Sequence, residues 1–266
     1  MKSLHQLKFE QFAEVQRYRT LVADAVRTKV VPHSGAIGAL LTGSVARGDA
    51  RRGPFGLYID LAVVVEHRQD FDPTQVFGPT VEPYIPKHCV KVDDVGIAVE
   101  LVTRNDLQDI RSRPESEIFA KQESIILYDS SGFLREWKET AFAITDEQKR
   151  QRALQCFFRL QYLVGEYRVE KWKHRSAWTQ LCQIGNEAAE CYCSFLHCVN
   201  GSFVPRKDWL VYLTYELGDK PPDHTSLLEA IYTSAPSEEP VASQFLHLSQ
   251  ALNWMSSYCD ARKWIS

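Results

Sequence analysis

Short apolar runs alternate with stretches of helical period over the first half of the chain. The runs at residues 36–41 and 59–65 are too short for buried helices, and the second is rich in β-branched residues, so both predict buried strands. Residues 89–103 predict a hairpin, because two apolar stretches flank a turn signal at Asp93-Asp94. The pattern of this half is typical of a domain that mixes strands and helices.

The pattern changes near residue 142, and after it nearly every segment repeats its apolar residues with helical period. Earlier in the chain, residues 5–29 predict a first helix and residues 124–128 a further strand. We therefore expect an α/β (α+β) domain over residues 1–142. An all-α helical bundle over residues 143–266 would follow it and would bind a substrate or another protein.

Composition narrows the class of protein without naming a function. The chain has 266 residues, a net charge of −3, 44% hydrophobic and 24% charged residues, which is an ordinary globular balance. A charge so close to zero gives no general attraction to polymer nucleic acid or to an anionic membrane. No apolar run approaches the roughly 18 residues that span a bilayer. Seven cysteines and the lack of a signal-like apolar core near Met1 favour a reducing, cytoplasmic location.

The segment with the clearest chemistry starts where the first strand ends, at Gly43-Ser44. A helix that begins there would point backbone N–H groups outward, which favours anions. Gly43 lets the chain approach a phosphate closely, and Ser44 fits the N-cap position of the helix. The Arg47 guanidinium would suit a phosphate, although a solvated loop is an alternative for it. On the next strand, Asp60 stands where Mg²⁺ could bridge a carboxylate and substrate phosphates.

Gly43-Ser44 with Arg47-Gly48-Asp49, followed by a strand that carries an aspartate, resembles the nucleotidyltransferases of the polymerase-β type. The similarity covers roughly residues 36 to 103, and it is closer to the small bacterial kanamycin and lincosamide nucleotidyltransferases. It implies a domain with a short mixed β-sheet. It also implies transfer of a nucleoside monophosphate from a nucleoside triphosphate such as ATP to a hydroxyl of a small molecule, with Mg²⁺. Many relatives form homodimers, and the sequence leaves that open.

The resemblance also assigns roles to particular residues. In the family, Gly-Ser holds the triphosphate, an Asp-x-Asp pair binds two Mg²⁺ ions, and a later strand supplies a third carboxylate. By position, Gly43 and Ser44 match the phosphate loop, with Arg47 as a further nucleotide-binding candidate. Asp60 matches the second Asp of the pair. Glu100 best matches the third carboxylate, as a metal ligand or general base, although alternation also allows it to face solvent.

One position departs from the family pattern. The first Asp of the pair should stand at residue 58, where this chain has Tyr58. A phenol is neutral near pH 7 and is a poor ligand for Mg²⁺, which leaves Asp60 and Glu100 as the anionic ligands. Two hypotheses follow: an active Mg²⁺-dependent nucleotidyltransferase, or a catalytically degenerate one that binds nucleotide or a protein partner.

Overall fold

The structure is a computed structural model that describes residues 4–52, 56–92, 95–232 and 235–265. The turn predicted at Asp93-Asp94 lies outside these residues. No helix in the part of the chain that the structure describes combines the length and the apolar character that crossing a membrane requires.

The chain divides into two compact units, Met1–Ala143 and Ile144–Ser266. The first contains a five-stranded sheet in the order β3-β4-β2-β1-β5. Strands β2 and β4 run parallel, and the other neighbouring pairs are antiparallel, which confirms the predicted short mixed sheet. The strands are β1 (Ala36–Thr42), β2 (Tyr58–Val65), β3 (His88–Val92), β4 (Val95–Thr103) and β5 (Ile125–Asp129).

The helices of this unit differ greatly in length. A long α1 passes into a π-helical turn, and the others have nine residues or fewer. They are α1 (Leu4–Ala25), η1 (Val26–Val30), α2 (Gly43–Arg47), η2 (Arg68–Asp70), α3 (Pro73–Phe77), α4 (Arg104–Gln108), η3 (Ile110–Ser112), α5 (Glu115–Gln122) and α6 (Phe133–Ala141).

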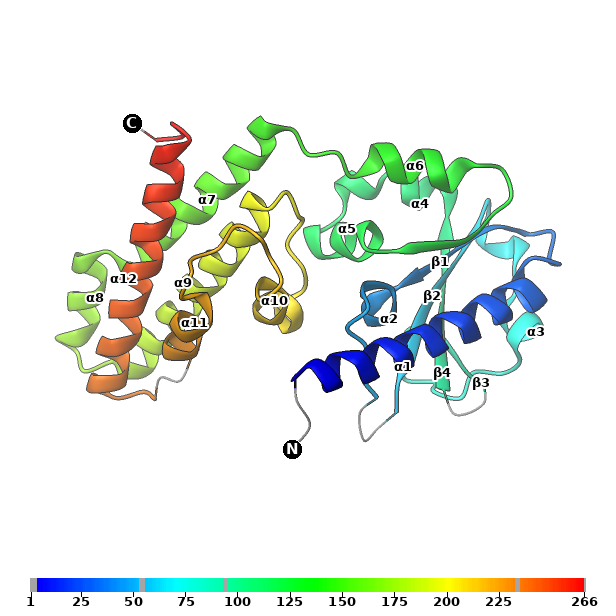
Figure 1. Cartoon of the computed structure of the whole chain (residues 1–266), viewed down its shortest axis with the longest axis horizontal. Helices are drawn as coiled ribbons and strands as arrows, with labels where there is room; N and C mark the ends of the chain where they lie inside the picture. Colours follow the sequence, from blue (N-terminus) through cyan, green and yellow to red (C-terminus); the bar gives the residue numbers. More distant parts are fainter. Residues whose placement is uncertain (1–3, 53–55, 93–94, 233–234, 266) are drawn as a thin grey trace. The chain divides into compact units, whose positions relative to one another are not determined.

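The two faces of the sheet have different neighbours. Successive side chains of β2 point to opposite faces, so Ile59 and Leu61 share the core with Val22 of α1, which crosses in front of the sheet in Figure 1. On the other face, Gly38 of β1 lies against Leu134 of α6, and a Cβ there would come closer than 3.0 Å to the leucine. Asp60 alternates with Ile59 and Leu61 and therefore belongs to this second face.

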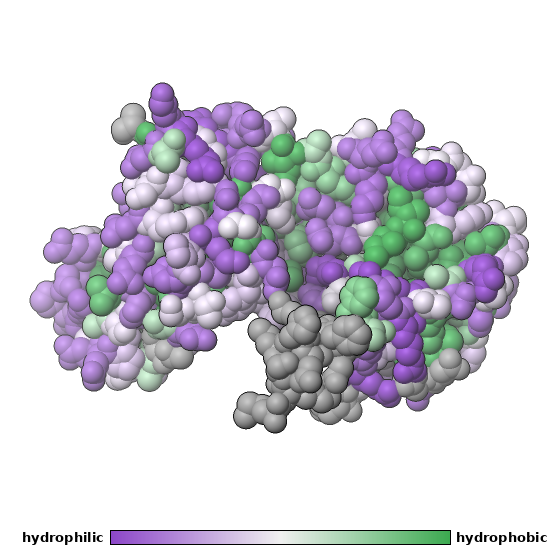
Figure 2. All heavy atoms as spheres, viewed as in Figure 1, coloured by the Kyte–Doolittle hydropathy of each residue, from purple (hydrophilic) through white to green (hydrophobic). Residues whose placement is uncertain are grey.

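The second unit is all-helical, as predicted. Its helices are α7 (Asp146–Val164), α8 (Glu166–Lys173), α9 (Trp178–Val199), α10 (Lys207–Thr214), α11 (His224–Tyr232) and α12 (Glu238–Ala261). Helix α9 is central, because it contacts each of the other five. Figure 2 shows a mostly hydrophilic or intermediate surface over this unit, since its apolar side chains form a buried core.

Candidate functional site

The glycine-serine loop lies where β1 ends and α2 begins. The backbone is extended at Thr42, and Gly43 follows with a φ of 71°, which L side chains rarely adopt. The N-cap predicted at Ser44 is wrong: Thr42 takes that position, because the turn of the backbone already occurs at Gly43. The Ser44 carbonyl accepts hydrogen bonds from the amides of Gly48 (2.9 Å) and Asp49 (3.0 Å), which closes the loop.

Asp60 lies directly against this loop. Thr42 pairs with Asp60 across the antiparallel β1–β2 ladder, so the residue after Thr42 faces the aspartate side chain. A Cβ on Gly43 would lie closer than 3.0 Å to Asp60 Oδ2 and 3.3 Å from its Cγ. Two residues that the sequence assigned to one site are therefore in contact, and only glycine leaves room for the carboxylate.

The other oxygen of Asp60 is bound by a lysine. Lys87 Nζ donates to Asp60 Oδ1 at 2.7 Å, and both side chains are about one-third exposed, at 31% and 35%. Sequence reasoning missed Lys87, because it follows a proline-rich stretch without periodicity and meets Asp60 27 residues away along the chain. A cation therefore already lies at the carboxylate that the resemblance assigns to Mg²⁺.

Tyr58 is fixed as a neutral group beside Asp60. Its ring lies over Gly96 of β4, where a Cβ would come within 2.5 Å of ring carbons, and its hydroxyl donates to Glu82 Oε1 at 3.0 Å. Burial and this hydrogen bond raise the pKa of Tyr58 above its ordinary value. The phenol therefore stays protonated at pH 7 and supplies no charge for a metal ion.

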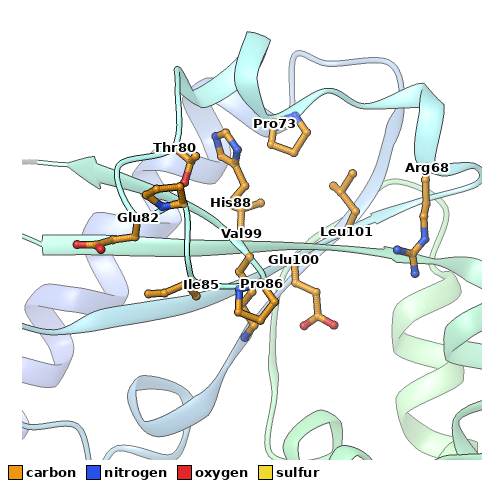
Figure 3. A pocket seen from close by; sticks show the side chains of 12 residues that line it. Arg68, Pro73, Thr80, Glu82, Ile85, Pro86, His88, Val99, Glu100 and Leu101 are labelled. Atoms are coloured by element: carbon orange, nitrogen blue, oxygen red, sulfur yellow. The ribbon is translucent and has the colours of Figure 1, made fainter.

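A cavity of about 530 Å³ borders this part of the sheet. It lies beside β4 near Val99, the residue that pairs with the first residue of β3. Figure 3 shows Thr80, Glu82 and Ile85 on the segment that borders the cavity, with Glu100 and Leu101 extending from β4. The lining residues are Arg68, Pro73, Thr80, Glu82, Pro83, Ile85, Pro86, Lys87, His88, Val99, Glu100 and Leu101.

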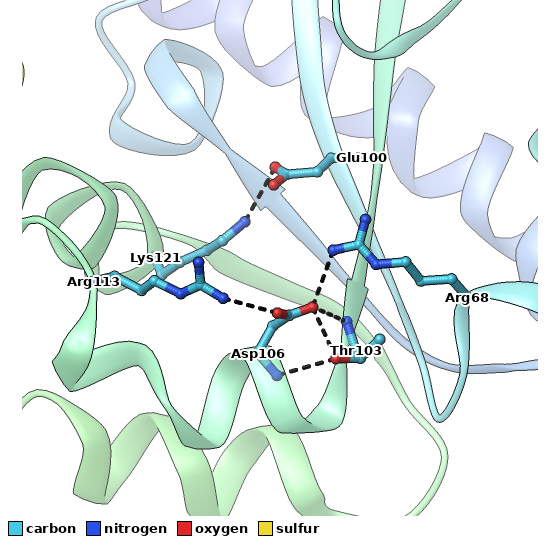
Figure 4. Close-up of polar contacts among 6 residues, drawn as sticks. All are labelled: Arg68, Glu100, Thr103, Asp106, Arg113 and Lys121. Atoms are coloured by element: carbon cyan, nitrogen blue, oxygen red, sulfur yellow. Dashed lines mark hydrogen bonds and ion pairs between the residues drawn. The ribbon is translucent and has the colours of Figure 1, made fainter.

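Glu100 shares a sheet face with Asp60 but not its position along the strands. Asp60 pairs with Ala98 in the parallel β2–β4 ladder, and Glu100 pairs with Ala62, two residues further on. Strands about 4.8 Å apart and a rise of about 3.3 Å per residue place the two Cα atoms roughly 8 Å apart. The Glu100 carboxylate forms an ion pair with Lys121 Nζ at 3.3 Å (Figure 4). The two predicted ligands therefore have separate cationic partners.

The charged residues next to Glu100 have a structural role. Asp106 accepts hydrogen bonds from the Thr103 amide (3.0 Å) and hydroxyl (2.8 Å), the capping box of α4 (Figure 4). Arg68 and Arg113 reach its two oxygens at 3.3 and 3.0 Å. Burial would raise the pKa of Asp106, but the hydrogen bonds from Thr103 and the nearby Arg68 outweigh it and lower the pKa. This cluster stabilises the start of α4.

Arg47 is held within its own loop. Its guanidinium binds Asp49 through two hydrogen bonds, at 3.1 and 3.3 Å, and the two side chains are only 11% and 15% exposed. Arg19 of α1 donates to the carbonyls of Val45 (3.0 Å) and Ala46 (2.6 Å), which attaches α2 to the first helix. Arg47 thus shapes the loop in this structure, and its contact with a nucleotide stays a prediction.

The donor set does not fit the two-metal site that the resemblance implies. Within the described residues, no group of three or more His, Cys, Asp or Glu side chains is placed to hold a metal ion. Asp60 is paired with Lys87, Glu100 with Lys121, and Tyr58 stands where a further carboxylate would be needed. Mg²⁺ requires several oxygen ligands in near-octahedral geometry, which these residues do not offer.

Comparisons with known proteins add little to this geometry. Neither a family model nor a curated protein matches the sequence. Among solved structures, the chain is similar to a nucleotidyltransferase-like protein from Exiguobacterium sibiricum 255-15, with 13% identity and a TM-score of 0.47. The match covers 91% of this chain and 78% of that one. So distant a similarity assigns no role to any residue.

Proposed function

We propose that the first unit is a nucleotidyltransferase-like domain that binds a nucleoside triphosphate at Gly43-Ser44 and has a degenerate catalytic metal site. The observation that carries this proposal is the Asp60–Lys87 ion pair of 2.7 Å beside the loop. The loop keeps the positive-φ glycine that lets the backbone approach a phosphate, and Asp60 lies against it. Of the three carboxylates that the resemblance implies, one is replaced by Tyr58 and the other two are paired with lysines, which disfavours a bound Mg²⁺ ion.

Electrostatics support the degenerate assignment. Two unit charges about 4 Å apart interact by about 4 kcal/mol at an effective dielectric constant near 20, and a divalent ion doubles the repulsion. Lys87 therefore opposes Mg²⁺ at Asp60 by several kcal/mol, less the screening that its partial exposure allows. Neutral Tyr58 adds nothing to offset that repulsion.

Mg²⁺-dependent transfer of a nucleoside monophosphate to a small-molecule hydroxyl is the second candidate function. The contact between Asp60 and Gly43 favours it, because the family places its metal-binding carboxylate beside the phosphate loop. It requires Lys87 to move away from Asp60. It also requires Glu100 to release Lys121 and to bind a metal ion or accept a substrate proton instead. The helical unit would then hold the acceptor; in the degenerate protein it would contact a partner protein.

Calorimetric titration of ATP into the protein, with Mg²⁺ or with EDTA, separates these functions. We expect ATP to bind under both conditions, and Asp60→Ala to keep binding in EDTA because Lys87 is released toward the phosphates. Asp24→Ala, at an exposed site on α1, is the control. Binding that needs both Mg²⁺ and Asp60 would establish an intact metal site instead. No heat under any condition would refute nucleotide binding and direct the search to a protein partner.

A further inference from the structure

The segment from Gly78 to His88 forms a strap that its own hydrogen bonds hold in place. The Val81 amide donates to the Cys89 carbonyl at 2.8 Å, and the Cys89 amide donates to Thr80 Oγ1 at 3.1 Å. His88 Nε2 hydrogen-bonds the Gly78 carbonyl at 2.8 Å. These hydrogen bonds connect the two ends of the strap next to β3, so the backbone that carries the side chains between them is held in place.

Two side chains of this strap reach Tyr58 and Asp60, which lie on the same face of β2. Glu82 accepts the hydroxyl hydrogen of Tyr58 at 3.0 Å, and Lys87 donates to Asp60 at 2.7 Å. Each contact is complementary: the neutral hydroxyl of Tyr58 meets the Glu82 carboxylate, and the Asp60 carboxylate meets the Lys87 ammonium. A strap that merely packed against the sheet would not need to match both positions.

The position of the Lys87 ammonium defines the chemistry. One Asp60 oxygen binds it, and the other faces Gly43, so a single carboxylate separates the cation from the phosphate loop. Lys87 also lines the cavity beside β4, and its flexible side chain is about one-third exposed. It can therefore turn from Asp60 toward a ligand on the loop without movement of the backbone.

We propose that Lys87 is the resident cation of this site, in place of a metal ion, and that the site takes a nucleoside di- or triphosphate without a divalent metal. The ammonium neutralises Asp60 in the free protein and contacts phosphate oxygens in the bound one. The contact between Lys87 and phosphate oxygens rests on the proposed nucleotide binding. The claim that Lys87 occupies the place of a metal ion at Asp60 does not. A lysine serves as a point-charge phosphate ligand, which suits this position.

Lys87→Met tests the proposal, because it keeps the length of the stem and removes the charge. Two titrations are compared: Mn²⁺ into the free protein, followed by electron paramagnetic resonance, and ATP in EDTA, followed by calorimetry. We expect Lys87→Met to bind Mn²⁺ at least about tenfold more tightly than the wild type, since Asp60 loses its counterion. We expect its ATP affinity in EDTA to fall at least about tenfold.

Two further variants control this experiment. Lys29→Met changes an exposed lysine on η1 of the same unit and should leave both affinities unchanged. Lys87→Arg keeps the charge and should retain weak Mn²⁺ binding and metal-free ATP binding. An unchanged Mn²⁺ affinity in Lys87→Met overturns the proposal, and so does an unchanged ATP affinity where the wild type binds ATP. If the wild type binds no ATP, the proposed function fails and the Mn²⁺ titration alone decides whether Lys87 is the resident cation.

Discussion

The contact between Gly43 and Asp60 can be disturbed by a single methyl group, in the variant Gly43→Ala. The alanine would have to keep a φ near 71°, and its Cβ would lie 3.3 Å from Asp60 Cγ and closer still to Oδ2. The aspartate must then rotate away, which lengthens its ion pair with Lys87. One substitution therefore strains the backbone, displaces the carboxylate and releases the ammonium.

The magnitude follows from these three effects on the free energy of unfolding. An L residue in the left-handed region costs about 1–2 kcal/mol. Displacement of Asp60 costs about 1 kcal/mol, the low end for overpacking, because its side chain is about one-third exposed and free to rotate. Loss of an ion pair that is about one-third exposed adds less than about 1 kcal/mol. We expect the first unit to lose about 3 kcal/mol, or roughly a hundredfold in its folded-to-unfolded ratio.

Gly132→Ala is a matched control for the backbone strain. Gly132 has a φ of 80°, and no heavy atom of the described structure lies within 4 Å of a Cβ built there. Hydrogen exchange of β1 and β2 peptides across a urea titration would measure the unfolding of the first unit. Gly43→Ala should cost about 1–2 kcal/mol more than the control, and a second substitution, Asp60→Ala, should recover the roughly 1 kcal/mol that comes from displacing the carboxylate. Equal costs for the two glycine variants, or no recovery, would refute the proposed contact.

Three further predictions concern both units. Burial lowers the pKa of His224 from 6.5 to about 4, so between these pH values the folded second unit binds fewer protons than the unfolded chain. Urea midpoints should therefore show about 3 kcal/mol of stability lost as pH falls from 6.5 to 4. A His224→Asn variant should show a flatter dependence of stability on pH. Gly185→Ala would bring a Cβ within 2.5 Å of the buried Gln244 amide carbon, so a thermal melt should show that the second unit loses roughly 2 kcal/mol of unfolding free energy. Tyr58→Asp adds a carboxylate beside Asp60 and should raise Mn²⁺ affinity by roughly tenfold in the same resonance titration; no gain would contradict our placement of the site.

The elements of the fold were predictable because periodicity reports burial directly. The runs at residues 36–41 and 59–65 are strands of the sheet, and the helical period after residue 142 corresponds to the all-helical unit. The N-cap position was not predictable in the same way. Ser44 has the residue type of an N-cap, but the positive φ of Gly43 moves the helix start two residues earlier, and sequence pattern does not report that angle.

Register and long-range partners limited the prediction of the site. Alternation placed Glu100 on one of two faces, but its level relative to Asp60 depends on how β2 and β4 align, which a single sequence does not specify. Lys87 and Glu82 come from a stretch with several prolines and no periodic pattern, and each meets its partner more than twenty residues away. Residue type alone does not distinguish such a lysine from a solvated one.

The Tyr58–Glu82 and Asp60–Lys87 contacts of the strap are best explained together, by the charge that they leave at the site. The family pattern implies three carboxylates, a charge of −3 that bound Mg²⁺ would neutralise. Here Tyr58 removes one negative charge, and the remaining carboxylates, Asp60 and Glu100, are paired with Lys87 and Lys121. With Glu82, which accepts the hydrogen bond of the phenol, these six groups sum to −1. A site with that sum has little attraction for a divalent ion, yet it keeps a cation next to the glycine-serine loop. If the strap served only to hold the sheet edge, replacing Lys87 and Glu82 together would change stability and leave the metal and nucleotide affinities where they were.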